Sequence, residues 1–367
     1  MLIKAKGVIM GKLKLKPGVV TGSQLQEIFE YCKSVPCALP AVNVVGSNSI
    51  NAAMQSAREA NAPIIIQFSN GGGQFNAGKF LDNTDQRAAV AGSVAGAHHI
   101  RMLAEYYGVP VILHTDHCAL KVIKWVDGML EFGEKYYKEN GRPLFSSHML
   151  DLSEESLDEN LRISKEYLQR MAKMDMTLEI ELGVTGGEED GVDNTDIDSS
   201  RLYTQPEEVL QAYDTLNGVG EFTVAAAFGN THGVYKPGNV KLRPDILKHS
   251  QDKIQADRGT KERPLDLVFH GGSGSTPEEI KEAVSYGVIK MNIDTDTQWA
   301  FTKPIKEYMD KNDAYLHSQI GNPEAPDKPN KKKIDPRGWL HLGEKGMVER
   351  LVQAFENLGS RDKFDLG

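Results

Sequence analysis

Cysteine is scarce in this chain, and the residues present do not follow a disulfide pattern. The chain of 367 residues has only Cys32, Cys37 and Cys118, and their odd number and irregular spacing argue against a secreted disulfide scaffold. Long apolar runs are also missing, because none approaches the roughly 20 residues that a membrane-spanning helix needs. The basic N-terminus, MLIKAKGVIMGKLKLKPG, lacks the apolar core of a signal peptide. We therefore expect a cytoplasmic protein without a membrane partner.

An excess of positive charge is missing as well. Lysine and arginine number 42 against 51 aspartates and glutamates, which gives a net charge of −9. Nucleic-acid binding needs a basic surface, so we expect no nucleic-acid partner. A small anionic substrate is still compatible with this balance, because a pocket can be locally positive in an acidic protein.

Short apolar runs alternate with longer amphipathic segments along most of the chain. Eight runs are almost continuously apolar and rich in β-branched residues, which is typical of parallel strands buried on both faces. They span 38–45, 63–69, 109–117, 144–153, 176–183, 222–230, 265–274 and 287–296. Helical patterns lie between them at 48–60, 84–107, 118–139, 154–174, 206–217, 277–286 and 297–312. This alternation predicts an α/β fold, a (β/α)₈ TIM barrel, with the whole chain, 1–367, as one domain.

The barrel pattern has an N-terminal lead-in and a C-terminal extension, 313–367. Within the extension, 317–339 is rich in proline, asparagine and lysine, so we predict irregular structure there, followed by a helix at 342–358. A further segment, 183–200, is rich in glycine and acidic residues and is predicted to be a long loop. Loops of this length inside a compact domain usually serve a function.

Histidines lie at the carboxyl ends of three of the predicted strands: His114 and His117 at the third, His232 at the sixth and His270 at the seventh. The carboxyl ends of barrel strands meet at one face, where active sites lie. Imidazole is a preferred zinc ligand, and catalytic zinc keeps one position open for substrate. A single histidine at such a place is more often a packing residue, but three on separate strands favour a metal site.

The spacing leaves two orientations open. His114 and Asp116 share a face while the strand lasts, whereas His117 faces the other way unless the chain has already left the strand. Glu179 and Glu181 also share a face, and either can reach the centre of the barrel.

Two polar loops after the last two strands have the character of a phosphate site. FHGGSGS (269–275) and NIDTDT (292–297) occupy the positions at which barrels often bind phosphate through backbone N–H groups. A plain glycine-rich turn is the alternative. The acidic segment TGGEEDG (185–191) can deliver a general base when a loop closes, although a solvated loop is the simpler interpretation.

The motifs VILHTDHC, LFSSHMLDLSEES, LEIELGVTGGEEDGVDN, AAAFGNTHGVYKPGNV, VFHGGSGST and MNIDTDTQWA, in this order, resemble class II fructose-bisphosphate aldolases. The resemblance covers nearly the whole chain, from AVNVVGSNSI to PNKKKIDPRGW. It implies a homodimeric barrel that reversibly cleaves fructose 1,6-bisphosphate to dihydroxyacetone phosphate and glyceraldehyde 3-phosphate in glycolysis and gluconeogenesis. The charge left on C3 would be held as an enediolate that zinc stabilises.

The resemblance also assigns roles to single residues. The catalytic zinc would be bound by three histidines: His117, His232 and His270. Asp116 would transfer the proton of the C4 hydroxyl, and Glu189 the proton at C3. Asp151 and Glu181 correspond to a second, buried metal position, and carbonyls near the HG motifs bind a monovalent cation, Na⁺ or K⁺, in the family.

A set of loop residues matches the family's substrate contacts, with an arginine that reaches the second phosphate from the partner subunit. The set is Asn43, Ser69, Gly233, Gly271, Gly272, Ser273, Asn292, Ile293, Asp294, Thr295 and, as that arginine, Arg337.

Other functions fit parts of the pattern. A tagatose-bisphosphate aldolase shares the scaffold, with opposite stereochemistry at C4. A zinc hydrolase accounts for the histidines but not for the paired phosphate loops. A non-catalytic phosphosugar-binding or moonlighting protein does not explain why the acid, the base and the metal ligands are all present. A lysine Schiff-base aldolase is disfavoured, because the sixth run lacks lysine and Lys290 is better interpreted as a salt-bridge residue.

Overall fold

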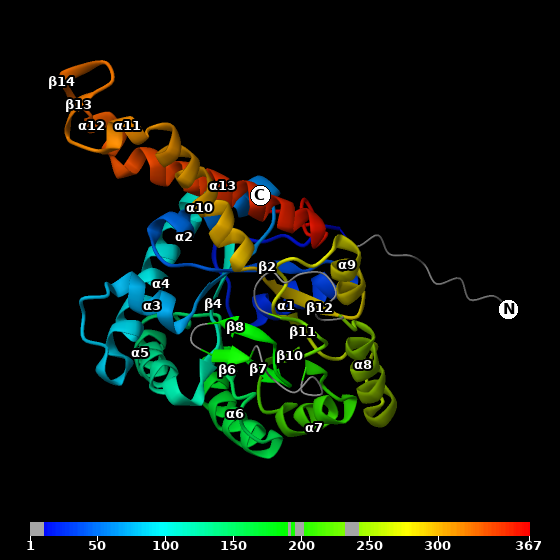
Figure 1. Ribbon diagram of the computed structural model, residues 1–367. Coiled ribbons are helices and arrows are strands. Elements are labelled where there is room, and N and C mark those ends of the chain that lie inside the picture. The colour runs from blue at the N-terminus through cyan, green and yellow to red at the C-terminus, as the bar shows by residue number, and fades with distance from the viewer. Residues whose placement is uncertain (1–10, 190–191, 195–201, 232–241) are drawn as a thin grey trace.

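A ring of parallel strands surrounded by helices forms the body of the protein (Figure 1). The computed structural model describes residues 11–189, 192–194, 202–231 and 242–367. The eight principal strands of the described part are short and almost fully buried. They are β2 (Leu39–Asn43), β3 (Ile64–Phe68), β4 (Pro110–Thr115), β6 (Ser147–Asp151), β7 (Thr177–Leu182), β10 (Phe222–Ala226), β11 (Leu267–Phe269) and β12 (Val288–Asn292). Each lies within a predicted strand, so the predicted barrel is confirmed.

The strands follow the order β4-β3-β2-β12-β11-β10-β7-β6, with short β1 (Gly18–Val19) and β5 (Cys118–Ala119) at the two ends of the sheet. Two contacts close the ring between β4 and β6. The Ser146 N–H donates to the Leu113 carbonyl at 2.8 Å, and β5, which follows β4, pairs with β6 in parallel. Closure joins the two ends of the described sheet and brings the carboxyl ends of its principal strands to one face.

Helices cover the outside of the ring and its amino end. They are α1 (Ser23–Ser34), α2 (Ser47–Ala60), α3 (Asn70–Ala77), α4 (Arg87–Tyr107), α5 (Lys124–Asn140), α6 (Leu157–Ala172), α7 (Pro206–Leu216), α8 (Asp245–Arg258), α9 (Pro277–Ser285) and α10 (Thr295–Lys311), with 3₁₀ turns at Thr84–Gln86 and Leu120–Val122. The sequence analysis missed α1, α3 and α8. Three consecutive glycines hide α3, and α8 buries only a narrow stripe on an otherwise polar helix.

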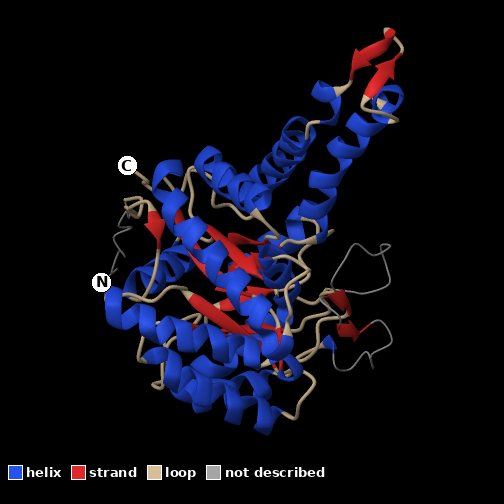
Figure 2. Cartoon of the chain, turned by 90° about the vertical axis from the view of Figure 1, so that its left-hand side faces the viewer, coloured by secondary structure: helices blue, strands red, loops and turns tan. Residues whose placement is uncertain are grey.

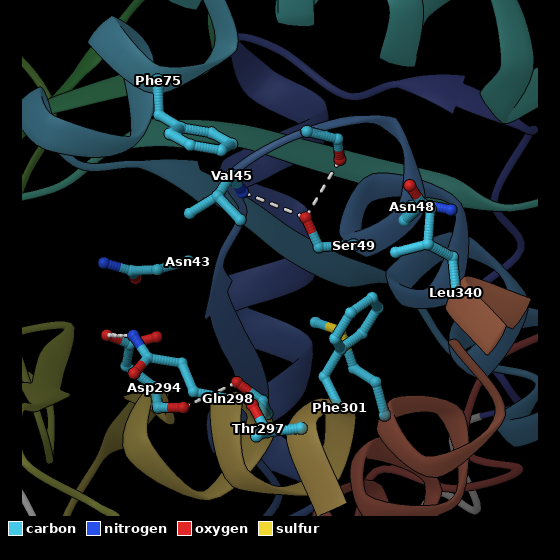
Figure 3. A pocket seen from close by; sticks show the side chains of 13 residues that line it. Asn43, Val45, Asn48, Ser49, Phe75, Asp294, Thr297, Gln298, Phe301 and Leu340 are labelled. Atoms are coloured by element: carbon cyan, nitrogen blue, oxygen red, sulfur yellow. Dashed lines mark hydrogen bonds between the residues drawn. The ribbon is translucent and has the colours of Figure 1, made fainter. Parts of the chain in front are cut away.

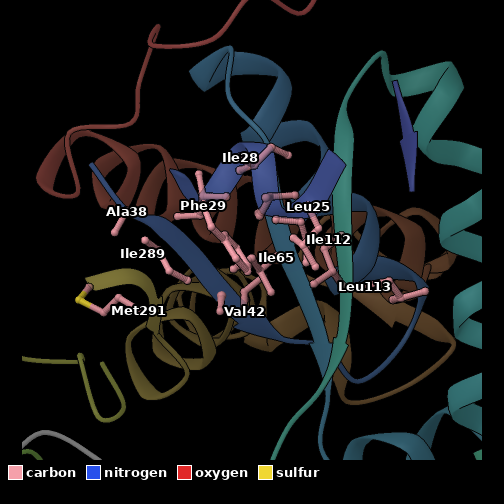
Figure 4. Packing of buried hydrophobic residues seen from close by; sticks show 14 of the residues in the cluster. Leu25, Ile28, Phe29, Ala38, Val42, Ile65, Ile112, Leu113, Ile289 and Met291 are labelled. Atoms are coloured by element: carbon pink, nitrogen blue, oxygen red, sulfur yellow. The ribbon is translucent and has the colours of Figure 1, made fainter. Parts of the chain in front are cut away.

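Helix α1 crosses the amino ends of the strands. Gln26 donates to Thr177 at the start of β7, and Lys33 pairs with Asp266 just before β11. Leu25 and Phe29 of this helix pack against the buried aliphatic side chains of β2, β3 and β4 (Figure 4). Helix α1 therefore covers the amino end of the barrel, and the carboxyl end is the end at which a site for polar chemistry is expected.

The C-terminal extension forms an arm that projects from the barrel (Figure 2). The prediction of irregular structure over 317–339 was wrong, because β13 (Ile320–Asn322) and β14 (Ala325–Pro329) form an antiparallel hairpin between α11 (Asp313–Leu316) and α12 (Lys331–Ile334). The final helix, α13 (Pro336–Asn357), begins earlier than predicted. Asp335 caps it by accepting the Arg337 N–H, and proline is favoured at the first helical position. The predicted loop 183–200 also contains a hairpin, β8 (Gly187–Glu189) with β9 (Val192–Asn194).

Candidate active site and metal centre

Polar side chains gather where the barrel strands end. Asp116 and His117 follow β4, Asp151 ends β6 and His270 follows β11, while Glu181 lies on β7 one residue before its end. All five come from the same end of parallel strands, so the closed ring brings them together. The ligand atoms of Asp116, His117 and His270 lie within 4.8 Å of one another, as do those of His117, Asp151 and Glu181.

A break in the strand decides the orientation of His117. Its φ is +44°, in the left-handed region that non-glycine residues rarely adopt, and it lies between β4 and β5. The break turns the ring to the side on which Asp116 lies. His117 Nδ1 then lies 2.9 Å from Asp151, and its ring centroid lies 4.6 Å from that of His270. Backbone strain of this kind clusters at functional sites. Here it accompanies the contact of His117 with Asp151, which lies 34 positions later in the chain.

Glu181, which is buried, and Asp151, whose side chain is 11% exposed, form an acidic pair beside His117. Burial alone would raise the pKa of Asp151, but hydrogen bonds with His117 and Ser153 hold it below its usual value. Burial and the charge of Asp151 raise the pKa of Glu181 to about 8, although Thr185 donates to this carboxyl at 2.7 Å. Two carboxyls with an imidazole therefore favour a bound cation, which lets both be charged.

Asp116 is held in place by amide groups from three strands. Gln67 Nε2 and Asn43 Nδ2 donate to its Oδ2 at 2.8 and 3.2 Å, and Asn292 Nδ2 donates to Oδ1 at 3.1 Å. Asp116 and Gln67 are fully buried. These contacts fix the carboxylate plane, which is what a group that accepts a proton at one defined atom needs.

Glu179, which shares the inner face of β7 with Glu181, has a separate set of partners. Lys290 donates to both of its oxygens at 2.8 Å, and His270 Nε2 lies 2.8 Å from Oε1. Burial would raise the pKa of Glu179, but the charge of Lys290 lowers it overall. The expected salt-bridge role of Lys290 is confirmed. The nearby His114 donates or accepts at Ser147 Oγ, 2.7 Å away, and burial with the Lys290 charge holds its pKa well below the usual value.

Comparison with known proteins agrees with this architecture. Residues 23–363 match the sequence model of the family "Fructose-bisphosphate aldolase class-II". The chain belongs to this family. A fructose-bisphosphate aldolase of Edwardsiella ictaluri is 59% identical over 349 residues, covering 95% of this chain and 98% of the relative. A class 2 fructose-bisphosphate aldolase of Escherichia coli K12 is 56% identical over 350 residues, with the same coverage.

A solved structure supports the fold of this class II aldolase family member. The crystal structure of a fructose-bisphosphate aldolase from Campylobacter jejuni superimposes with a TM-score of 0.86 at 55% identity, covering 95% of this chain and 98% of the other. The family identified from the sequence motifs is thereby confirmed, and the chain is a lyase of the aldolase type. Among the described residues, no helix has the length and hydropathy to cross a bilayer.

Class II aldolases depend on a metal, and the donor groups of this chain suit one. Imidazole nitrogens and carboxylate oxygens from separate strands surround a common point, which is the donor chemistry of a divalent zinc-type ion. The predicted third histidine, His232, lies outside the described residues, and so does Gly233. Glu189 ends strand β8, in the hairpin near the carboxyl face, and the structure describes its backbone only.

The two predicted phosphate loops pack against each other. Gly271 has φ +61°, and a Cβ there would lie 2.4 Å from the Thr231 carbonyl oxygen. The Gly272 N–H donates to the Asn292 carbonyl at 3.1 Å, and the Asp296 N–H donates to Ser273 Oγ at 3.4 Å. The glycines therefore allow a close approach of backbone to backbone, and Thr295 begins a long helix, α10, at the same place.

The remaining predicted substrate residues have different surroundings. Asn43 and Asp294 line one side of a cavity of about 450 Å³, with Phe301 and Leu340 on the other side (Figure 3). Ser69 caps α3 by accepting the Gly72 N–H. The side chain of Ile293 is buried in the core, and its N–H donates to the Ala41 carbonyl.

Arg337 is not brought to the strand ends within one chain. It lies in the first turn of α13, 88% of its side chain is exposed, and it pairs with Asp335 at 2.6 Å.

The sequence analysis missed Gln67 as a site residue. Its signal was present, since it is the one polar side chain in the buried run IIIQF. Asn230 was also missed, and it links the His270 carbonyl to Thr185.

Proposed function

We propose that this chain catalyses the reversible aldol cleavage of fructose 1,6-bisphosphate to dihydroxyacetone phosphate and glyceraldehyde 3-phosphate. The observation that carries the proposal is the junction of Asp116, His117 and His270 at the carboxyl face, beside the packed loops of Gly271 and Ser273. The names of its relatives support the same substrate. We place the reaction in glycolysis and gluconeogenesis, and hence in the cytoplasm.

Zinc is the metal we propose, held by His117, His270 and His232. When bound, it supplies positive charge that stabilises the negative charge left on the substrate when the C3–C4 bond breaks. Asp151 and Glu181 would hold a second divalent ion with His117, as their proximity supports. We also propose a monovalent cation, Na⁺ or K⁺, at the carbonyls of the HG motifs.

Asp116 acts as the base at the C4 hydroxyl during cleavage and returns the proton during synthesis. The three amides that hold its carboxylate leave it fixed before substrate arrives, so little reorganisation is needed in the transition state. Glu189 handles the proton at C3. Two carboxylates on separate elements allow the two proton transfers to occur independently.

Binding of the phosphates supplies the positioning energy. We assign one phosphate to backbone groups of the loops containing Gly233, Gly271, Gly272 and Ser273, with Asn292, Asp294 and Thr295 at the dihydroxyacetone half. Asn43 and Ser69 face the other half of the substrate.

The second phosphate requires a cation from another subunit in this proposal. The arm projects from the barrel of the single chain (Figure 2). The exposed Arg337 side chain, in the first turn of α13, is therefore available to a partner. We therefore propose a homodimer in which each arm completes the other site. The chain is then one domain, 1–367, with 313–367 as the extension that carries the arm.

A coupled assay tests the function. Triose phosphate release is measured from fructose 1,6-bisphosphate and from tagatose 1,6-bisphosphate, before and after treatment with a chelator and after zinc is restored. We expect cleavage of the fructose substrate, loss with the chelator and recovery with zinc. Activity that survives complete metal removal would contradict the zinc proposal, and cleavage of the tagatose substrate alone would contradict the substrate assignment.

A further inference from the structure

A buried ion pair spans the barrel interior next to the proposed metal ligands. Glu179 on β7 and Lys290 on β12 are 2% and 3% exposed, and the ammonium donates to both carboxylate oxygens at 2.8 Å. Two strands, β10 and β11, separate β7 from β12 in the sheet, so the pair bridges the inside of the ring. The proposed mechanism uses neither residue.

The pair contacts groups on both sides of the site, and Glu179 also lies 3.5 Å from His114 Nε2. Glu179 Oε1 lies 2.8 Å from His270 Nε2, and Lys290 Nζ lies 4.0 Å from Asp116 Oδ1. Lys290 also shares the inner face of β12 with Asn292, which donates to the same oxygen of Asp116. One charged unit therefore touches both a proposed zinc ligand and the proposed base.

A metal is not the natural occupant of this region. Ligand atoms of His114, Asp116 and Glu179 lie within 4.8 Å of one another, which is a metal-like grouping. However, the Lys290 ammonium already supplies a cation at hydrogen-bond distance from Glu179. A second positive ion there would be repelled by the ammonium.

We infer that Glu179 is a positioning residue for His270, and that Lys290 holds Glu179 in place as the charged acceptor. This inference rests on the proposed role of His270 as a zinc ligand. A carboxylate that accepts from Nε2–H fixes the tautomer and ring angle of His270, leaves Nδ1 for the metal and raises the basicity of that nitrogen. Lys290 prevents the buried carboxylate from being left without a counter-charge.

Zinc affinity is the direct readout, because it does not depend on turnover. Glu179→Gln keeps the shape of the side chain but removes its charge, and Lys290→Met removes the counter-charge. We expect each variant to bind zinc about 10- to 100-fold more weakly than the wild type in competition with a chromophoric chelator. The matched control is Lys33→Met, because Lys33 is a buried lysine, 6% exposed, paired with Asp266 at 2.7 Å at the other end of the barrel. That variant should keep the wild-type zinc affinity.

A spectroscopic measurement separates positioning from loss of structure. The ¹⁵N shifts of the His270 ring should show the Nε2–H tautomer in the wild type and a mixture of tautomers in Glu179→Gln. Lys290→Met alone leaves the buried Glu179 carboxylate without its counter-charge and can prevent folding. The double variant Glu179→Gln/Lys290→Met removes both charges and should still show the weaker zinc binding. Wild-type zinc affinity in Glu179→Gln and in the double variant would overturn the inference. This result would leave the proposed function intact, since the latter is judged by substrate cleavage in the wild type.

Discussion

Replacing Gln67 by leucine removes one donor to the proposed base while keeping the size of the side chain. Gln67 is fully buried, and its Nε2 lies 2.8 Å from Asp116 Oδ2. A hydrogen bond to a charged acceptor contributes about 1.5–3 kcal/mol. If the contact is needed in the transition state, its loss lowers kcat by roughly 10- to 150-fold, because each 1.36 kcal/mol is a factor of ten. KM should change little, since the proposed phosphate loops lie on other strands.

Steady-state kinetics on fructose 1,6-bisphosphate at saturating zinc measures the effect. Gln251→Leu is the matched control, because Gln251 is also buried and donates to the carbonyls of Leu265 and Tyr286, away from the site. The control should lose stability but keep kcat. A Gln67→Leu variant with wild-type kcat, or a control with an equal loss of kcat, would refute the assignment of Gln67 as a support for Asp116.

Three further predictions concern the backbone, the acidic pair and the arm. Gly271→Ala should destabilise the fold more than Gly259→Ala. Both glycines have φ near +60°, so backbone strain costs each alanine variant about 1–2 kcal/mol, but only Gly271→Ala also places a Cβ 2.4 Å from another backbone atom. Chemical denaturation of the two variants measures the difference in their free energies of unfolding. In metal-free protein, Glu181 has a pKa of about 8 when folded and a lower one when unfolded, so its contribution to stability is full below about pH 4.5 and is lost as the pH rises to about 8. Thermal unfolding from pH 5 to 8 should therefore show a steeper fall for the wild type than for Glu181→Gln, and equal slopes would contradict the raised pKa. Arg337→Ala should raise KM at least about tenfold, the loss of one charge-assisted contact, while the exposed-arginine control Arg361→Ala leaves KM unchanged.

Local sequence patterns were enough for the architecture and for the position of the site. A buried parallel strand is almost continuously apolar, and this property is visible in any window of a few residues. The eight principal barrel strands of the described residues therefore all lie within predicted ranges. The same reasoning places Asp116, His117 and His270 at strand ends. Where polarity or glycine masks the pattern, as in α3 and α8, the helices depend on packing against the barrel and were missed.

Only the tertiary structure decided which side chains meet. The orientation of His117 depends on one backbone angle of +44° between two strands, and strand periodicity alone does not reveal such a break. Glu179 and Glu181 share a face of one strand, yet the first meets Lys290 and the second meets Asp151 and His117, because the strands bearing these partners lie at different places around the ring. His270 lies between the two glutamates, 2.8 Å from Glu179 and 3.6 Å from Glu181. Local sequence was enough to indicate which residues carry the chemistry. Their partners are decided by closure of the barrel, which brings together residues more than a hundred positions apart, such as Glu179 and Lys290.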